Sequence, residues 1–265
     1  MFPQIVFFTF YFLLGAAVGS FLDVWARRLL RGEAPTGRSR CEHCGRKLST
    51  IDLVPLLSFF ALRGRCRYCK KPLSWRYPLV EGATGVIFAL LAWKLGFPTS
   101  VLELLTLAVL FVAVSSFIVI VLTDLTEQTI FDQTLWVALL ASAIYRILQF
   151  SAHFLLRSLL YDLLGALGIF ALLLLIRIVT HERGMGEADP PLGFLVGLLV
   201  GFPLSLLTLF LAFVLGGLAG SILILTKRKK LKDRVAFGPF LVSSAFLAFF
   251  FGQTLINWYL NLLFS

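Results

Sequence analysis

Charged residues are scarce in this sequence of 265 residues: Asp, Glu, Lys and Arg make up 14% of it, and hydrophobic residues make up 59%. A typical soluble domain is about 25% charged and about 45–50% apolar. The shortage of charge excludes a soluble enzyme and an intrinsically disordered chain, and four cysteines are too few for a secreted disulfide scaffold. Segments of about ten residues with alternating polarity, as in a transmembrane β-barrel, are also missing. The sequence therefore predicts an integral membrane protein built from helices.

Apolar runs of about 20 residues, the length that crosses a bilayer, predict an all-α polytopic fold with about eight transmembrane helices. The expected spans are residues 2–22, 79–97, 101–122, 134–150, 158–179, 187–202, 203–226 and 237–263. The sixth and seventh come from one run, Leu192–Thr226, which as a single helix would be about 52 Å long, against a hydrocarbon core of about 30 Å. We divide this run at Pro203, because proline cannot donate a backbone hydrogen bond.

Three regions follow: a first transmembrane helix over residues 1–24, a polar cytoplasmic insertion over residues 25–78, and a transmembrane domain over residues 79–265. We expect the first helix to be retained, because no basic segment precedes it as in a signal peptide. Thirteen of the 24 Lys and Arg residues lie in residues 25–78 and six in residues 227–234. With eight spans and an outside N-terminus, both clusters face the cytoplasm, as the positive-inside rule requires. The same charges favour contact with anionic membrane lipid, and we predict no nucleic-acid partner.

All four cysteines lie in residues 25–78, which we call the cysteine module. They form two CxxC pairs, Cys41 with Cys44 and Cys66 with Cys69. Two such pairs can close a tetrahedron of thiolates around Zn²⁺, and a site with four protein ligands has no position for a reacting water. The sequence therefore predicts a structural zinc site. The alternative is two reduced or disulfide-bonded pairs without metal.

Two acids at predicted membrane boundaries are candidate catalytic residues, because carboxylates near a span are costly and are functional candidates by default. Asp124 ends the third span, and Asp189 follows the glycines Gly184 and Gly186 at the start of the sixth. Two carboxylates in a partly dry site share one proton, an arrangement that suits hydrolysis of an amide by activated water. The alternative is that Asp124 is a helix-end acid facing water and that the glycines only form a turn.

Four other acids have simpler interpretations. We expect Asp132 to cap the fourth span, Glu187 to be a solvated loop acid, and Asp23 to pair with Arg27 four residues further along its helix. Glu81, at the start of the second span, is interpreted either as a helix N-terminal acid or as a substrate contact.

Six motifs in order resemble those of the prepilin peptidases, the polytopic aspartic proteases of the GxGD type. They are Gly19–Arg28, the paired knuckles from Cys41 to Cys69, Tyr77–Glu81, Asp124 with Ile130–Asp132, Gly184–Asp189 and Phe237–Phe240. The resemblance covers almost the whole chain. It implies that Asp124 and Asp189 are the catalytic pair. Three departures stand out: Phe131 and Ala188 replace a proline and a glycine of the motifs, and Pro190–Pro191 replace an apolar residue and a lysine.

The resemblance also implies the reaction and its place. The expected function is cleavage of the basic leader of type IV prepilins or type II secretion pseudopilins, at the cytoplasmic face of the bacterial inner membrane. Many family members also N-methylate the new amino terminus with S-adenosylmethionine, and the cysteine module accompanies that subgroup. Two other functions fit the residues alone: a small-solute or ion-coupled transporter, suggested by Gly201–Pro203 between two apolar segments, and an inactive secretion scaffold with the same fold.

Overall fold

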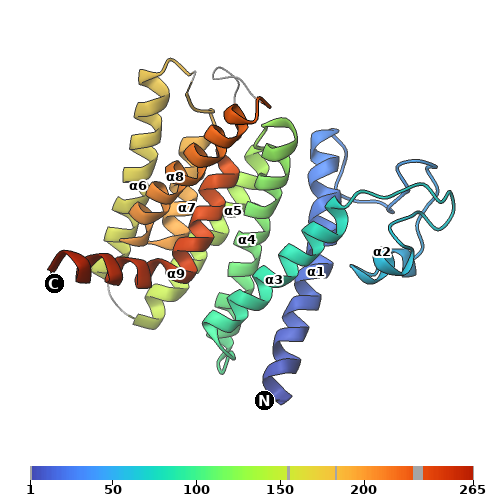
Figure 1. Cartoon of the computed structure of the whole chain (residues 1–265). Coiled ribbons are helices and arrows are strands. Elements are labelled where there is room, and N and C mark those ends of the chain that lie inside the picture. Colours follow the sequence, from blue (N-terminus) through green and yellow to red (C-terminus); the bar gives the residue numbers. More distant parts are fainter. Residues whose placement is uncertain (1, 154–155, 183, 229–234, 265) are drawn as a thin grey trace. The chain divides into compact units, whose positions relative to one another are not determined.

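The computed structural model describes residues 2–153, 156–182, 184–228 and 235–264, and these residues are almost entirely helical. The α-helices are α1 (Phe2–Leu30), α2 (Leu57–Ala61), α3 (Arg76–Leu95), α4 (Val101–Glu127), α5 (Asp132–His153), α6 (Leu156–Val179), α7 (Asp189–Val200), α8 (Leu204–Leu225) and α9 (Gly238–Phe264) (Figure 1). A 3₁₀ turn, η1, covers Ile51–Leu53. Within the described residues there is no strand, only isolated bridges between Arg40 and Lys47 and between Arg65 and Pro72. The predicted all-α fold is confirmed.

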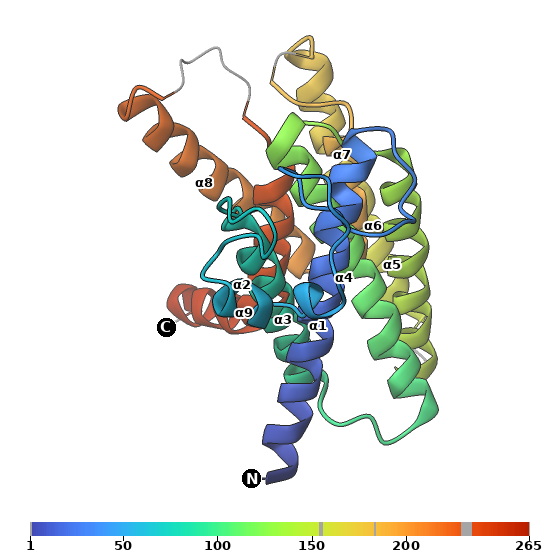
Figure 2. The same cartoon turned by 90° about the vertical axis from the view of Figure 1, so that its right-hand side faces the viewer.

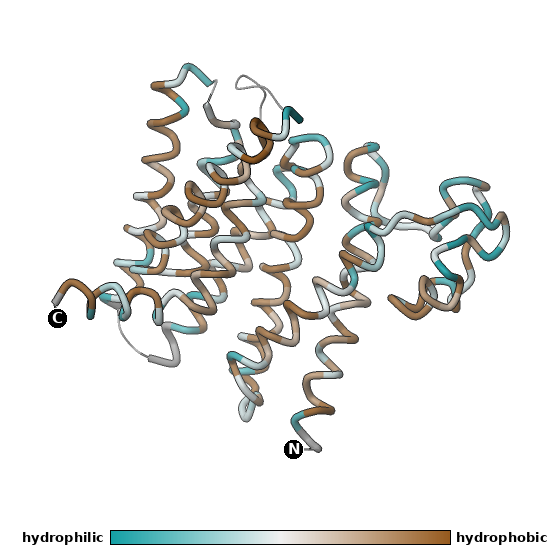
Figure 3. Tube along the Cα trace, in the orientation of Figure 1, coloured by the Kyte–Doolittle hydropathy of each residue, from teal (hydrophilic) through white to brown (hydrophobic). Residues whose placement is uncertain are grey.

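Six helices of the described part are long and apolar enough to cross a membrane: α1, α3, α4, α6, α8 and α9. Their surfaces carry large apolar side chains that other helices do not cover, such as Leu13, Leu164 and Phe210, each more than half exposed. Figure 3 shows hydrophobic residues along these helices and hydrophilic ones over much of the cysteine module. Apolar surface of this extent needs lipid around it, so the chain is a multi-pass membrane protein.

The other two predicted spans are α5 and α7, neither of which is among the six. Helix α5 has 22 residues and carries Arg146 near its middle. Helix α7 has only 12 residues, about 18 Å of helix, which is too short for a hydrocarbon core of about 30 Å. The predicted number of about eight spans is therefore approximate. The break at Pro203 is observed, because α7 ends at Val200 and α8 begins at Leu204.

The chain divides into two compact units, Met1–Phe111 and Val112–Ser265. In the first unit α1 and α3 pack closely, through small residues that face each other. A Cβ atom on Gly15 would lie 2.7 Å from the Thr84 carbonyl oxygen, and one on Gly19 would lie 2.8 Å from the Thr84 side chain. Such contacts let helix backbones approach and are typical of helix packing in lipid. Helix α1 continues to Leu30 and α3 begins at Arg76, so both ends of the cysteine module are helical.

The second unit is built around α7, whose residues are mostly buried. Gly193 and Gly197 face α6, where a Cβ atom on Gly193 would lie 2.5 Å from Leu173 and one on Gly197 would lie 3.0 Å from Ala166. Figures 1 and 2 show the end of α4, the end of α6 and the start of α7 at the same end of this unit. Helices α7 and α8 form a hairpin that returns the chain to that end. Of the basic cluster at residues 227–234, only Lys227 and Arg228 lie within the described residues.

Candidate functional site

Asp124 lies in the last turn of α4. The helix ends three residues later, and Gln128, with φ of 54°, turns the chain away. The Asp124 side chain is buried, and its Oδ2 accepts a hydrogen bond of 3.1 Å from the backbone N–H of Gly238 at the start of α9. The interpretation of Asp124 as a helix-end acid facing water is therefore wrong.

Asp189 is the first residue of α7 and is also buried. Its Oδ2 accepts a hydrogen bond of 2.7 Å from the backbone N–H of Gly186. A Cβ atom on Gly186 would lie 3.1 Å from that oxygen, so a side chain there would crowd the carboxylate.

The two carboxylates approach each other because α4, α7 and α9 meet at one end of the unit. A Cβ atom on Gly238 would lie 2.6 Å from Asp124 Oδ2 and 3.2 Å from Leu192, which is one turn beyond Asp189 on α7. Asp124 and Asp189 are close enough to interact electrostatically. The structure therefore brings together two acids that are far apart in the sequence.

Each carboxylate keeps one oxygen available for chemistry. Backbone N–H groups bind Oδ2 of both residues, and within the described residues these are the hydrogen bonds found at the two carboxylates. Two carboxyl groups held together in a partly dry site can divide their roles, one keeping a proton and the other ionised. Such a pair can activate a water molecule and polarise a carbonyl group.

The neighbouring acids do not belong to this pair. Asp132 is exposed at the first position of α5, and its role as a cap of that helix stays a prediction. The Glu187 side chain is 87% exposed and lies 3.9 Å from Arg177, as expected for a solvated loop acid.

An ion pair that sequence reasoning missed holds the opposite end of α7. Arg146 of α5 donates through Nε to the Leu198 carbonyl oxygen, at 2.7 Å, and its Nη1 lies 3.5 Å from Asp162 of α6. Asp162 in turn accepts a hydrogen bond of 2.7 Å from the backbone N–H of Phe202. The two side chains thus fix the turn between α7 and α8. Two charged residues inside predicted spans were the available signal, since such residues rarely lack a partner.

Buried acids anchor the cysteine module to the helices of the first unit. Asp23 pairs with Arg27 at 2.9 Å, as expected from their spacing, but also with Arg76 of α3 at 2.7 Å. Arg27 also binds Glu42 within the module and the Tyr77 hydroxyl group. Glu81 is buried and accepts a hydrogen bond of 2.7 Å from the backbone N–H of Leu56. These contacts give Asp23 and Glu81 a structural role.

The four cysteines form one cluster in which all the Sγ atoms lie within 4.8 Å of one another. The Sγ atoms of Cys41 and Cys69 are 3.9 Å apart and all four cysteines are free. A tetrahedron with metal–sulfur distances of about 2.3 Å has sulfur atoms about 3.8 Å apart, so the cluster could hold a metal ion. Burial acts to raise the pKa of the Cys66 thiol, but hydrogen bonds from the backbone N–H groups of Cys69 and Tyr68 and from the neighbouring thiols lower it to about 7. The backbone N–H of Lys71 acts to lower the pKa of Cys69, but burial and hydrogen bonds with the other thiols raise it to about 11. A lowered pKa therefore favours the metal-binding thiolate at Cys66 and not at Cys69.

Comparisons with known proteins agree along nearly the whole chain. Residues 13–95 match the bacterial peptidase A24 N-terminal domain, and residues 111–221 match the type IV leader peptidase family. A prepilin leader peptidase/N-methyltransferase from Stutzerimonas stutzeri is 30% identical over 278 residues, covering 94% of this chain and 92% of that protein. Proteins of the same name from Pseudomonas aeruginosa and Bacillus subtilis are 29% and 30% identical, with 94% and 95% of this chain covered and 92% and 97% of those proteins. No solved structure matches this chain.

Proposed function

The chain belongs to the prepilin leader peptidase family, and from this premise we propose that it is a membrane-embedded aspartic endopeptidase with Asp124 and Asp189 as its catalytic pair. Its substrates are type IV prepilins or type II secretion pseudopilins, whose basic leader it removes at the cytoplasmic face of the bacterial inner membrane. The approach of two buried carboxylates at the meeting point of α4, α7 and α9 carries this proposal.

The reaction needs only these two side chains and water. The ionised carboxylate takes a proton from a water molecule, which attacks the scissile carbonyl carbon, while the protonated one donates a hydrogen bond to the carbonyl oxygen. The tetrahedral intermediate breaks when the leaving nitrogen receives a proton from the pair. Backbone N–H groups of Gly186 and Gly238 hold one oxygen of each acid, so the other oxygens are positioned for the transfer.

The decisive test removes one acid at a time. Asp124→Asn and Asp189→Asn should each lower the rate of prepilin cleavage by about 10²–10⁴-fold, because each residue acts in proton transfer. Mass spectrometry of a co-expressed prepilin measures the cleavage, and circular dichroism verifies that the helices persist. Asp132→Asn and Glu187→Gln, which change exposed acids close in sequence to Asp124 and Asp189, serve as matched controls. Full activity of either catalytic variant would end the proposal.

We extend the proposal to methyl transfer with S-adenosylmethionine, since the relatives described above carry that activity in their names. The same spectra test it, because methylation of the new amino terminus adds the mass of one methyl group to the processed product. A cleaved but unmethylated pilin, from cells that contain the methyl donor, would contradict it.

We also propose that the metal of the cysteine module is zinc, held by Cys41, Cys44, Cys66 and Cys69. Four thiolates complete the coordination of the ion, so its contribution is structural. The transporter interpretation is not favoured, because the relatives are named as peptidases and both acids lie where helices of one unit end rather than along their middle. The same names argue against an inactive scaffold.

A further inference from the structure

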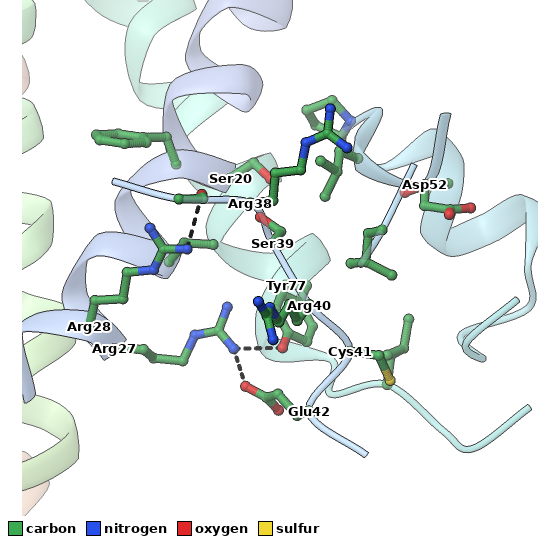
Figure 4. Close-up of a pocket in the computed structure, with 18 of the residues that line it drawn as sticks. Ser20, Arg27, Arg28, Arg38, Ser39, Arg40, Cys41, Glu42, Asp52 and Tyr77 are labelled. Carbon is green, nitrogen blue, oxygen red and sulfur yellow. Dashed lines mark hydrogen bonds and ion pairs between the residues drawn. The ribbon is translucent and has the colours of Figure 1, made fainter. Parts of the chain in front are cut away.

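The first unit contains a cavity of about 810 Å³ that the proposed peptidase reaction does not use. It lies between the C-terminal half of α1, the segment of residues 33–42 and part of the cysteine module. Arg28 shapes it, donating hydrogen bonds to the carbonyl oxygens of Pro35, at 2.7 Å, and Gly37, at 3.1 Å. Figure 4 shows Arg28, Arg38 and Arg40 around this cavity, together with Ser20 and Ser39.

The cavity has more guanidinium groups than acids to neutralise them. Six arginines line it, of which Arg27 pairs with Glu42 and Arg67 with Asp52. Arg28 binds only carbonyl oxygens, and Arg31, Arg38 and Arg40 form no ion pair within the described part of the chain. Of the other acids in the wall, Glu81 is bound to a backbone N–H, and Glu33, exposed like Arg31, Arg38 and Arg40, forms no ion pair within the described residues. Several unpaired guanidinium groups around one space fit a phosphate group, which can accept bidentate hydrogen bonds.

One wall of the cavity is amphipathic and follows a helix that is long and apolar enough to cross the membrane. Ala17, Phe21 and Val24 give it an apolar half, Arg28 follows on the same side of α1, and Arg31 comes directly after the end of the helix. From Ala17 to Arg28 the helical part of this wall is about 16 Å long at 1.5 Å per residue. The Phe21 side chain is 52% exposed, so the apolar half has surface available for an acyl chain.

We propose that this cavity binds one anionic phospholipid, with its phosphate among Arg28, Arg31 and Arg38 and an acyl chain along Ala17, Phe21 and Val24. The positive charge of the arginines favours a phosphate group, and the apolar side of α1 favours an acyl chain, so both features together favour a phospholipid. A basic leader peptide would be repelled by the arginines. S-adenosylmethionine is disfavoured by its net positive charge, because it carries a sulfonium and an ammonium group against one carboxylate. A free phosphate compound would leave the apolar wall uncovered. The site does not depend on the proposed peptidase activity.

The test uses the full chain in nanodiscs of equal parts phosphatidylglycerol and phosphatidylcholine, with native mass spectrometry of the protein released from them. The wild type should retain phosphatidylglycerol over phosphatidylcholine by about tenfold, since each arginine near a membrane surface contributes to the binding of anionic lipid. The double variant Arg31→Ala/Arg38→Ala should lose most of this preference, and Arg31→Lys/Arg38→Lys should keep part of it. Lys47→Ala/Lys71→Ala is the matched control, because it removes two exposed charges of the same module outside the cavity wall.

Zinc content and circular dichroism establish that each variant is folded. Equal retention of both lipids by the wild type would overturn the proposal, and so would a preference that the Arg31/Arg38 variant keeps. Addition of S-adenosylmethionine or glycerol phosphate should leave the bound lipid in place. Displacement of the lipid by either compound would assign the cavity to that ligand instead.

Discussion

The cysteine module and the second unit are stabilised by different means. Residues 31–75 contain only short helices, and Cys41, Cys66 and Phe59 are the buried apolar residues of that segment. Helices in the second unit bury much of their length against each other, with Gly193 and Gly197 of α7 in contact with α6. A small polar segment cannot build an adequate core and needs a metal or cross-link, whereas helices in lipid depend on close packing and on paired charges. The metal ligands should therefore be the residues most important for stability in the cysteine module, and the glycines at helix contacts should be among the most important in the second unit.

Loss of the metal should give the largest effect, confined to the module. Structural zinc contributes about 10–16 kcal/mol of apparent binding energy in small metal-stabilised domains, so Cys41→Ser/Cys66→Ser should unfold residues 31–75 and leave the second unit helical. Zinc analysis measures the loss of the metal, limited proteolysis measures the unfolding of residues 31–75, and circular dichroism measures the remaining helix. His43→Ala is the control, since His43 lies between the ligands but outside the cluster. If the wild-type protein is folded without bound metal, the idea that a metal stabilises the cysteine module is wrong.

Removal of one partner of the Arg146 and Asp162 pair should give the next largest effect, confined to the second unit. Arg146→Gln leaves Asp162 without its cation and should lower the free energy of unfolding by about 3 kcal/mol. The double variant Arg146→Gln/Asp162→Asn should be less destabilised than the sum of the single changes, because neither charge is then unpaired. Thermal unfolding in detergent gives the stabilities. Wild-type stability of Arg146→Gln would show that the pair does not hold the turn between α7 and α8.

A methyl group at the contact between α6 and α7 should cost less. Gly193→Ala places a Cβ atom 2.5 Å from Leu173 and 2.8 Å from Ile169, and overpacking of this kind costs about 1–3 kcal/mol. Gly168→Ala, on α6, is the matched control, because its Cβ atom would meet nothing within 4 Å. The same unfolding measurement compares them. Equal stability of the two variants would mean that α7 can move away from α6 without loss.

The smallest effect is expected at Asp52, which accepts hydrogen bonds from Ser49 at 2.7 Å and from Arg67 at 2.6 Å. Burial acts to raise the pKa of Asp52, but these bonds lower it overall. Its contribution is therefore complete above the usual aspartate pKa of about 3.9 and is lost only as the pH falls through the lower folded-state value. Asp52→Asn should speed zinc loss by about fivefold or less, since an ion pair whose cation, Arg67, is 45% exposed contributes less than about 1 kcal/mol. The rate of zinc loss from Asp52→Asn divided by the rate from the wild type should be the same at pH 6 and pH 8. A ratio that changes between these pH values would assign the effect to another group.

The fold could be predicted from apolar runs and turn residues, because a helix in lipid must satisfy its own backbone. The length of α7 could not, since Leu192–Thr226 is apolar on both sides of the break and hydropathy does not distinguish a spanning helix from a short buried one. The cysteine cluster followed from local spacing. Partners distant in the sequence were missed: Arg76 for Asp23, Leu56 for Glu81 and Asp162 for Arg146. The pairing of Asp124 with Asp189 was predicted from their positions at predicted membrane boundaries, and the family motifs then supported it.

The contact between α9 and Asp124 has a consequence for which amino acids position 238 can accept. Any side chain there would begin 2.6 Å from a carboxylate oxygen that the backbone N–H of the same residue binds. Gly217 and Gly220 of α8 have open space where a Cβ atom would be. In a library of all single substitutions, selected for pilus assembly, glycine alone should survive at position 238, whereas positions 217 and 220 should accept many replacements.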